Sequence, residues 1–218
     1  MKVFENRLQA GQELAEALEE YAGRGDVVVL GLPRGGVPVA MEVARKLRAP
    51  LDVFLVRKLG VPGHEELAMG AIASGGVFVR NEGIISRLSI SEDAIERVAQ
   101  EEKKELKRRE RAYRGDTSPV QLAGKTVILV DDGLATGASM RAAVQAVRHH
   151  DPAQVVVAVP TAPPDTKGAL KTDADDVVCV ETPRPFGGVG RWYRDFAQTK
   201  DEEVRELLEK AYAELPAA

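Results

Sequence analysis

The sequence predicts an α/β protein in which a mostly parallel five-stranded sheet carries helices on both faces. Two observations lead to this prediction. Five short runs rich in valine and leucine alternate with longer amphipathic segments along the 218-residue chain, the order typical of strand–helix–strand units. The runs are apolar at successive positions, as in strands that are buried on both faces. A chain of this length buries a sizeable core, and we expect residues 1–218 to form a single domain.

The first half of the chain supplies two strands and three helices. Continuous apolar runs predict strands at 27–30 and 51–56. Apolar residues at helical spacing predict helices at 6–22, 35–47 and about 91–114. Asn6 and Ser91 are residue types that cap helix N-termini. The long third helix is expected to be an insertion in the strand–helix alternation.

Glycines and a proline interrupt the range 59–83. This pattern predicts a lid-like loop of about 59–83, within which 71–73 and 77–79 form a small hairpin.

Regular alternation resumes in the second half. Strands are expected at 126–130, 155–159 and 177–180. Helices are expected at 138–149, 165–171 and 202–215. The range 182–199 is irregular and rich in aromatic residues.

Composition excludes several classes of protein. Thirty basic and thirty-four acidic residues give a net charge of −4, which argues against a general nucleic-acid-binding surface. The single cysteine, Cys179, excludes an internal disulfide framework, and its apolar neighbours predict a buried thiol. No apolar stretch reaches the length of a membrane span, and the N-terminus lacks the apolar centre of a signal peptide. We therefore expect a cytoplasmic protein with no membrane partner.

The segment 127–139 carries the most informative pattern. A buried strand ends in Asp131 and Asp132, and a turn of small residues then leads into a helix. The adjacent carboxylates are suited to accept hydrogen bonds from a vicinal diol. The turn residues place free backbone N–H groups and two hydroxyls at a helix N-terminus, where a phosphate binds; they are Thr136, Gly137, Ala138 and Ser139. Carboxylates followed by a phosphate cradle predict a ribose 5-phosphate pocket.

This segment resembles the phosphoribosyl pyrophosphate (PRPP) motif of type I phosphoribosyltransferases, which has four hydrophobic residues, two acids, small residues and Thr-Gly. Together with Leu-Pro-Arg-Gly-Gly at 32–36 and Arg-Trp-Tyr-Arg-Asp-Phe at 191–196, it resembles most the predicted, functionally undefined phosphoribosyltransferases of bacteria. The resemblance covers most of the chain and implies the type I fold. It implies that the 5-phosphate is bound by Ala135, Thr136, Gly137, Ala138 and Ser139.

Two further loops follow strands and carry basic residues. In the first, Gly35 and Gly36 let the backbone approach an anion closely, and Arg34 supplies a fork of donors. The resemblance implies that this loop holds pyrophosphate, often through a non-proline cis peptide, although Arg-Gly-Gly alone is also an ordinary turn. Arg57 and Lys58 leave the second strand, where a basic residue contacts pyrophosphate in the family; a solvated charge is the alternative. We expect Arg34, Lys58, Asp131 and Asp132 to be the catalytic group.

The range 182–199 resembles the hood that many type I enzymes build over the base. Phe186, Trp192, Tyr193 and Asp195 are the expected hood residues, since aromatic faces and a carboxylate can orient a flat heterocycle. The alternative is that the aromatic residues pack on the core, and both can hold. Members of the family carry a mobile lid at the position of residues 59–83. His64, in this range, is either a donor to pyrophosphate or a solvated loop histidine.

One position departs from the family. Purine-salvage members carry an acid next to Thr-Gly, and here that position is Ala135. Either the acceptor needs no proton transfer or Asp195, Glu65 or Glu66 supplies it. The expected function is magnesium-dependent transfer of phosphoribosyl from PRPP to a nitrogenous base or another nitrogen acceptor. Asp131 and Asp132 would meet the magnesium indirectly, through substrate and water. The alternative is a regulatory protein that senses PRPP or a nucleotide without turnover.

The long helix carries seven basic residues between Lys103 and Arg114. Such a patch could meet RNA or a nucleotide phosphate. Ordinary pairing at i, i+4 spacing, as between Glu105 and Arg109, on a solvated or inter-subunit face is the favoured interpretation. A homodimer is expected from the family alone.

Overall fold

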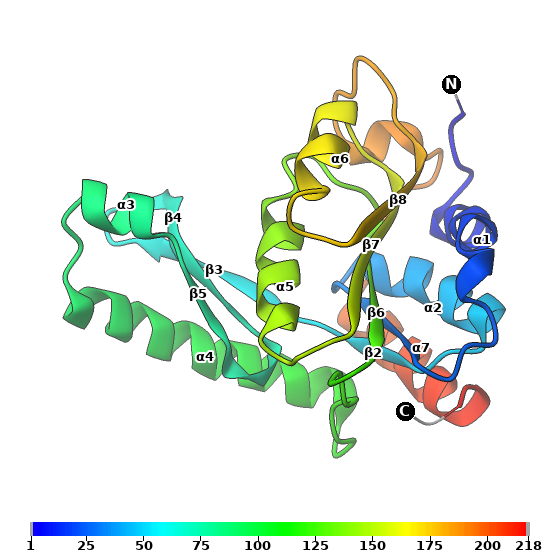
Figure 1. The fold of residues 1–218 in the computed structure, drawn as a ribbon, viewed down its shortest axis with the longest axis horizontal. Coiled ribbons are helices and arrows are strands. Elements are labelled where there is room, and N and C mark those ends of the chain that lie inside the picture. The colour runs from blue at the N-terminus through cyan, green and yellow to red at the C-terminus, as the bar shows by residue number, and fades with distance from the viewer. Residues whose placement is uncertain (1, 217–218) are drawn as a thin grey trace.

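The computed structural model describes residues 2–216, apart from the side chain of Glu66. Its central sheet has five parallel strands in the order β2-β1-β6-β7-β8 (Figure 1). Their bounds are β1 Val27–Gly31, β2 Leu51–Val53, β6 Thr126–Val130, β7 Gln154–Thr161 and β8 Asp176–Glu181. The five-stranded parallel sheet is therefore confirmed, and the prediction of one strand over 51–56 is wrong at its end.

Helices cover both faces of this sheet (Figure 1). On one face lie α1 (Arg7–Ala17), α2 (Gly36–Leu47) and α7 (Asp201–Glu214); on the other lie α5 (Ala138–Arg148) and α6 (Pro164–Leu170). Alternate residues of each strand enter different cores. Ile128 and Val130 pack with α1, α2 and α7, whereas Val127 and Leu129 pack with α5. Asn6 caps α1 by accepting a hydrogen bond from the Gln9 N–H at 3.0 Å.

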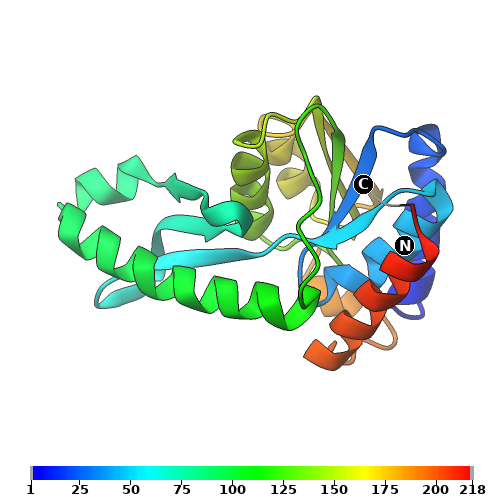
Figure 2. The same ribbon diagram turned by 90° about the horizontal axis from the view of Figure 1, so that it is seen from below.

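An arm projects from one end of this body (Figures 1 and 2). It consists of the antiparallel strands β3 (Val56–Val61), β4 (His64–Ala73) and β5 (Phe78–Arg80), with the helices α3 (Glu82–Arg87) and α4 (Glu92–Arg114). The lid-like loop predicted at 59–83 is thus mostly sheet and helix. The predicted hairpin pairing is confirmed, with Ala71 opposite Val79.

The glycines between residues 59 and 83 led to the wrong prediction of a loop. Gly60 lies at a register irregularity between β3 and β4, a usual place for glycine in a strand. A Cβ at Gly70 would lie 2.5 Å from the Val79 carbonyl oxygen, so the strands pack closely only because Gly70 has no side chain. Leu59 and Met69 are fully buried in the same core as Ile95 of α4. That burial stabilises a sheet where the glycine spacing indicated a loop.

A buried ion pair fixes the C-terminal end of α4 to the body. Arg114 Nε donates to Asp52 Oδ1 at 2.7 Å, and its Nη2 donates to the Val53 carbonyl at 2.6 Å. Both charged side chains are almost fully buried, so the prediction of a solvated face is wrong for Arg114. Tyr113, the preceding residue, donates to Asp201 Oδ1 at 2.7 Å. The last turn of α4 is therefore held against β2 and the start of α7.

The aromatic range 182–199 wraps over the end of the sheet and contains a 3-10 helix, Val189–Trp192. Cys179, predicted to be buried, is half-buried, and burial raises the pKa of its thiol to about 11. Across residues 2–216, none of the helices has both the length and the apolar character that crossing a membrane requires.

Candidate functional site

Asp131 and Asp132 lie at the carboxyl end of β6, whose five residues are all buried. The Asp132 N–H donates to Asp131 Oδ1 at 2.9 Å, which turns the first carboxylate over the strand end. Burial raises the pKa of both carboxyl groups, and the neighbouring charge of Asp132 raises the pKa of Asp131 further. Two carboxylates held close together in a poorly solvated place favour a ligand that neutralises or hydrogen-bonds them.

Arg7, the first residue of α1, compensates this charge. Its Nε donates to Asp132 Oδ2 at 2.9 Å and its Nη2 lies 2.8 Å from the same oxygen, and Arg7 lowers the pKa of Asp132 against the effect of burial. Its Nη1 donates to the Ala197 carbonyl at 2.7 Å, and its guanidinium lies 4.1 Å from the centre of the Phe196 ring. Arg7 therefore joins the acid pair to the aromatic segment. Sequence reasoning missed it, because nothing in the local pattern marks a contact across 125 residues.

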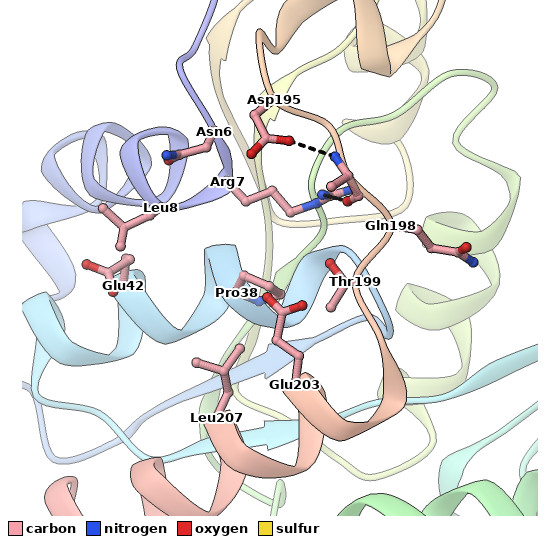
Figure 3. Close-up of a pocket in the computed structure, with 11 residues that line it drawn as sticks. Asn6, Arg7, Leu8, Pro38, Glu42, Asp195, Gln198, Thr199, Glu203 and Leu207 are labelled. Carbon is pink, nitrogen blue, oxygen red and sulfur yellow. Dashed lines mark hydrogen bonds between the residues drawn. The ribbon is translucent and has the colours of Figure 1, made fainter.

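A cavity of about 280 Å³ lies on the outer side of Arg7, between α1, α2, α7 and the 195–199 segment (Figure 3). Its polar lining includes Glu42, Gln198 and Glu203, and neither residue of the acid pair belongs to it. In Figure 3 the Arg7 side chain reaches across towards the 195–199 segment, where the Asp195 carboxylate accepts a hydrogen bond from the Ala197 N–H at 3.0 Å. This hollow thus lies beside the site of the acid pair.

The loop after β1 is pressed against the acid pair. A Cβ at Gly35 would lie 2.0 Å from Asp132 Oδ2, and one at Gly36 would lie 2.7 Å from the Val130 carbonyl oxygen. Only glycine fits this approach. The peptide between Pro33 and Arg34 is cis. The Arg34 guanidinium points to Asp201, with 3.8 Å between Nη1 and Oδ1.

The start of α5 completes this edge of the sheet. Gly137 adopts φ 72° just before the helix, a conformation that favours glycine. Thr136 precedes Gly137 and is exposed, and Ala138 and Ser139 follow it as the first residues of α5. The Ala138 N–H makes a long contact of 3.4 Å with Thr136 Oγ1, so the helix N-terminus is open to an anion. Ala135 is exposed and offers its carbonyl to Thr166 at 2.7 Å.

A second cavity, of about 130 Å³, joins these parts. Asp131, Ser139 and Arg57 line it. Two residues of α4, Arg109 and Tyr113, also line it, although sequence reasoning assigned their helix to solvent or a subunit interface. Lys58 is exposed and follows Arg57 in β3, so it projects from the opposite face of that strand. The structure therefore brings Arg57, and not Lys58 or Arg34, into this cavity.

The aromatic segment packs mostly on the protein itself. Trp192 and Tyr193 are buried in one small core with Phe4, and Phe186 stacks on Trp192 with 6.3 Å between ring centres. The Tyr193 hydroxyl donates to the Asp132 carbonyl at 2.5 Å, and burial raises its pKa. Asp195 is exposed and holds the turn at Ala197. Tyr193 thus fixes the segment to the acid pair.

The outer turn of the arm is remote from this site. Six residues of β3 carry the chain about 20 Å, at about 3.3 Å per residue, before the turn to β4 (Figure 2). His64 and Glu65 lie at that turn, away from the acid pair, and the side chain of Glu66 lies outside the described part of the chain. Among the described residues, no three His, Cys, Asp or Glu side chains come together as a metal site.

Comparison with known proteins agrees with this geometry. The family model for a phosphoribosyl transferase domain matches residues 3–191. Two curated proteins of Mycobacterium tuberculosis, named "Putative phosphoribosyl transferase Rv0571c" (strain H37Rv) and "Putative phosphoribosyl transferase MT0597" (strain CDC 1551), are each 46% identical over all 218 residues. The chain spans about half, 49%, of the length of these relatives. The crystal structure of TT1426 from Thermus thermophilus is 44% identical, with a TM-score of 0.86 over 96% of this chain and 99% of that one.

Proposed function

The chain belongs to the phosphoribosyl transferase domain family, and from that premise we propose that it transfers the phosphoribosyl group of PRPP to a nitrogen acceptor. The reaction is magnesium-dependent and releases pyrophosphate. One observation carries the proposal: a half-buried acid pair, a close-packed glycine loop and an open helix N-terminus meet at one edge of the sheet. These are the groups that a ribose carrying phosphates at both ends requires.

Each part has a distinct role in this proposal. Asp131 and Asp132 accept hydrogen bonds from the ribose hydroxyls. The backbone N–H groups at 136–139 and the hydroxyls of Thr136 and Ser139 hold the 5-phosphate. The backbone of Gly35 and Gly36, together with Arg57, holds the pyrophosphate. Arg34 and Lys58 require a movement of their side chains to take part. The protein contributes positioning and charge stabilisation, with no covalent intermediate.

The acid pair fits a magnesium ion that arrives with its substrate. Two carboxylates provide the hard oxygen atoms that magnesium prefers, but they are too few for its six ligands. Asp131 and Asp132 would therefore meet the ion indirectly, through oxygen atoms of the substrate and water, which supply its ligands. When bound, the ion neutralises charge on the leaving pyrophosphate.

Chemistry at the ribose is a substitution. The bond from C1 to the pyrophosphate oxygen breaks as a bond from C1 to the acceptor nitrogen forms, and the nitrogen gives up a proton. The negative charge of Asp131 and Asp132 stabilises the positive charge that develops on the ring. Ala135 has no group to take that proton. The acceptor therefore loses its proton to solvent, or Asp195 takes the proton after the turn between Asp195 and Ala197 rearranges.

A sensor is the second candidate, and Ala135 favours it. A protein that only binds PRPP or a nucleotide needs the ribose and phosphate groups but no group for proton transfer. The cytoplasmic location stays a prediction from the sequence, and the homodimer stays a prediction from the family resemblance.

The discriminating experiment combines binding with turnover. Calorimetry with PRPP and Mg²⁺ is expected to show binding, and a panel of nitrogenous bases and simple amines is expected to contain one that releases pyrophosphate. PRPP binding without release for any acceptor would favour the sensor. Absence of PRPP binding would reject the transferase, and absence of nucleotide binding as well would reject both functions.

Replacing Gly35 with alanine tests the close approach of the loop to the acid pair. Gly35 has φ −60°, which any residue adopts, so the effect is steric alone. The new methyl group must displace Asp132 or Arg7, and we expect PRPP affinity to fall about tenfold, or about 1.4 kcal/mol. Calorimetry measures the loss. Gly25→Ala is the control, since a Cβ there meets no atom within 4 Å; equal affinities in both variants would contradict the role of the loop.

A further inference from the structure

The C-terminal half of α4 carries a face that points at the anion site. Residues three and four apart share one face of a helix, and Glu102, Leu106, Arg109 and Tyr113 follow that spacing. Leu106 is fully buried in the core and Tyr113 is anchored to Asp201. Because Arg114 is tied to Asp52 one residue later, Arg109 lies about one turn from two fixed points. The backbone position of Arg109 is therefore set by the fold.

Two arginines line one cavity from different elements. Arg57 comes from β3 and Arg109 from α4, and both line the 130 Å³ cavity that also contains Asp131 and Ser139. The cavity thus combines the carboxylate of Asp131, at the end of β6, with two arginines from other elements. That combination of charges suits a ligand that carries both a sugar and a strongly anionic group.

Each arginine is held by a glutamate of α4 through its Nε alone. Arg109 Nε donates to Glu105 Oε1 at 2.9 Å, and Arg57 Nε donates to Glu102 Oε2. Neither glutamate lines the cavity. Among the described residues, the terminal nitrogens of Arg57 and Arg109 donate no hydrogen bond to a protein acceptor. Both guanidinium groups are therefore oriented by a carboxylate and keep their terminal N–H groups for a ligand.

We propose that Arg109 of α4 joins Arg57 of β3 in binding the pyrophosphate group, with Glu105 and Glu102 as positioning residues. This inference rests on the proposed function, and it assigns part of the pyrophosphate site to the long inserted helix. A guanidinium binds phosphate oxygens in pairs, so two of them match a group with two phosphates. The basic face of α4 then serves the small-molecule site at Arg109, while its outer residues remain in solvent.

Arg108 provides a matched control. It is bound to the same Glu105, with 2.7 Å between Nε and Oε2, and lies one residue away. Its side chain is 65% exposed and does not line the cavity, whereas that of Arg109 is 43% exposed and does. Arg108→Gln and Arg109→Gln remove the same charge from the same ion-pair cluster. Only the second removes donors from the cavity.

The experiment titrates each variant with two probes, inorganic pyrophosphate with Mg²⁺ and ribose 5-phosphate. We expect Arg109→Gln to weaken pyrophosphate binding at least tenfold and leave ribose 5-phosphate binding within twofold of the parent. Arg108→Gln should leave both unchanged. Arg109→Lys keeps the charge but loses the fork, so it should weaken pyrophosphate binding by a smaller factor. It also provides the measurement if Arg109→Gln does not fold.

Two results would overturn the inference. Equal pyrophosphate affinity in the Arg108→Gln and Arg109→Gln proteins would show that Arg109 acts only as surface charge. A loss of ribose 5-phosphate binding as large as that of pyrophosphate would show a general structural effect. If the parent protein binds neither probe nor PRPP, the proposed function itself fails, and this outcome differs from the other two.

Discussion

Replacing Asp131 with asparagine will stabilise the fold at neutral pH while it weakens PRPP binding. Burial and the charge of Asp132 raise the pKa of Asp131 in the folded protein. The folded state therefore holds a proton more tightly than the unfolded chain does. Asparagine removes the buried charge and keeps one acceptor oxygen. Loss of a hydrogen bond to a charged group costs about 1.5–3 kcal/mol, which is about tenfold to hundredfold in PRPP affinity.

The direction of the pH dependence follows from the raised pKa. For a carboxyl group with a raised pKa in the folded state, its contribution to stability is fully present below the unfolded pKa and is lost as pH rises through the folded pKa. The Asp131→Asn protein does not lose this contribution. Its advantage in melting temperature over the parent should be largest at neutral pH and shrink as the pH falls towards the unfolded pKa of aspartate, about 4. Calorimetry across this range measures it.

Asp195→Asn is the control for this experiment, because it changes an exposed carboxylate of the aromatic segment. It should show no gain in melting temperature at neutral pH. A parent protein that is more stable than Asp131→Asn at neutral pH would contradict the argument. Such a trade between stability and function is common at active sites.

The central sheet could be predicted because its signal is local. Runs such as 126–130 and 155–159 are buried on both faces, so nearly every residue is apolar and the strand is evident from the sequence. The location of the acid pair followed from the same signal, because ligands of such sheets bind at the carboxyl ends of strands. The Gly35 loop lies beside Asp132 because β1 and β6, the strands that precede these residues, are neighbours in the sheet.

The arm could not be predicted because glycine has two meanings. At Gly63 it allows φ 79° in the turn after β3, whereas at Gly70 it allows two strands to approach. The sequence shows only glycine at both positions. Burial of Met69 decides between the two, and burial depends on α4, which follows about twenty residues later.

Residues of the candidate site that come from distant parts of the chain could not be predicted from the sequence either. Arg7 and Arg109 belong to helices whose polar faces are ordinary in composition, and their roles depend on which element each face meets. Aromatic residues pose the opposite problem. Trp192 and Tyr193 are residue types that stack on ligands, yet in the structure both are buried against Phe4, which gives them a structural role. Composition alone does not distinguish a ring that stacks on a ligand from one that packs on the core.

Replacing Arg7 with glutamine will shift the pH dependence of PRPP binding towards higher pH. Arg7 is the group that lowers the pKa of Asp132 against the effect of burial. Without it, the Asp132 carboxyl group protonates at a higher pH and loses the charge that we propose interacts with the ribose and, through it, the magnesium ion. The hydrogen bond to the Ala197 carbonyl is lost as well, which loosens the aromatic segment. We expect a loss of about 1–3 kcal/mol of stability at neutral pH.

The pH dependence of the stability change separates loss of the ion pair from simple loss of packing. At low pH Asp132 is protonated in both proteins, so the ion pair contributes little and the stability gap should narrow. Arg7→Lys keeps the charge without the fork, and it should recover part of the pH shift but less of the affinity. Arg194→Gln is the control, since Arg194 pairs with Glu5 at 3.2 Å and is exposed. PRPP titrations from mildly acidic to mildly alkaline pH that give the same midpoint for Arg7→Gln and Arg194→Gln would show that Arg7 does not set the charge of the acid pair.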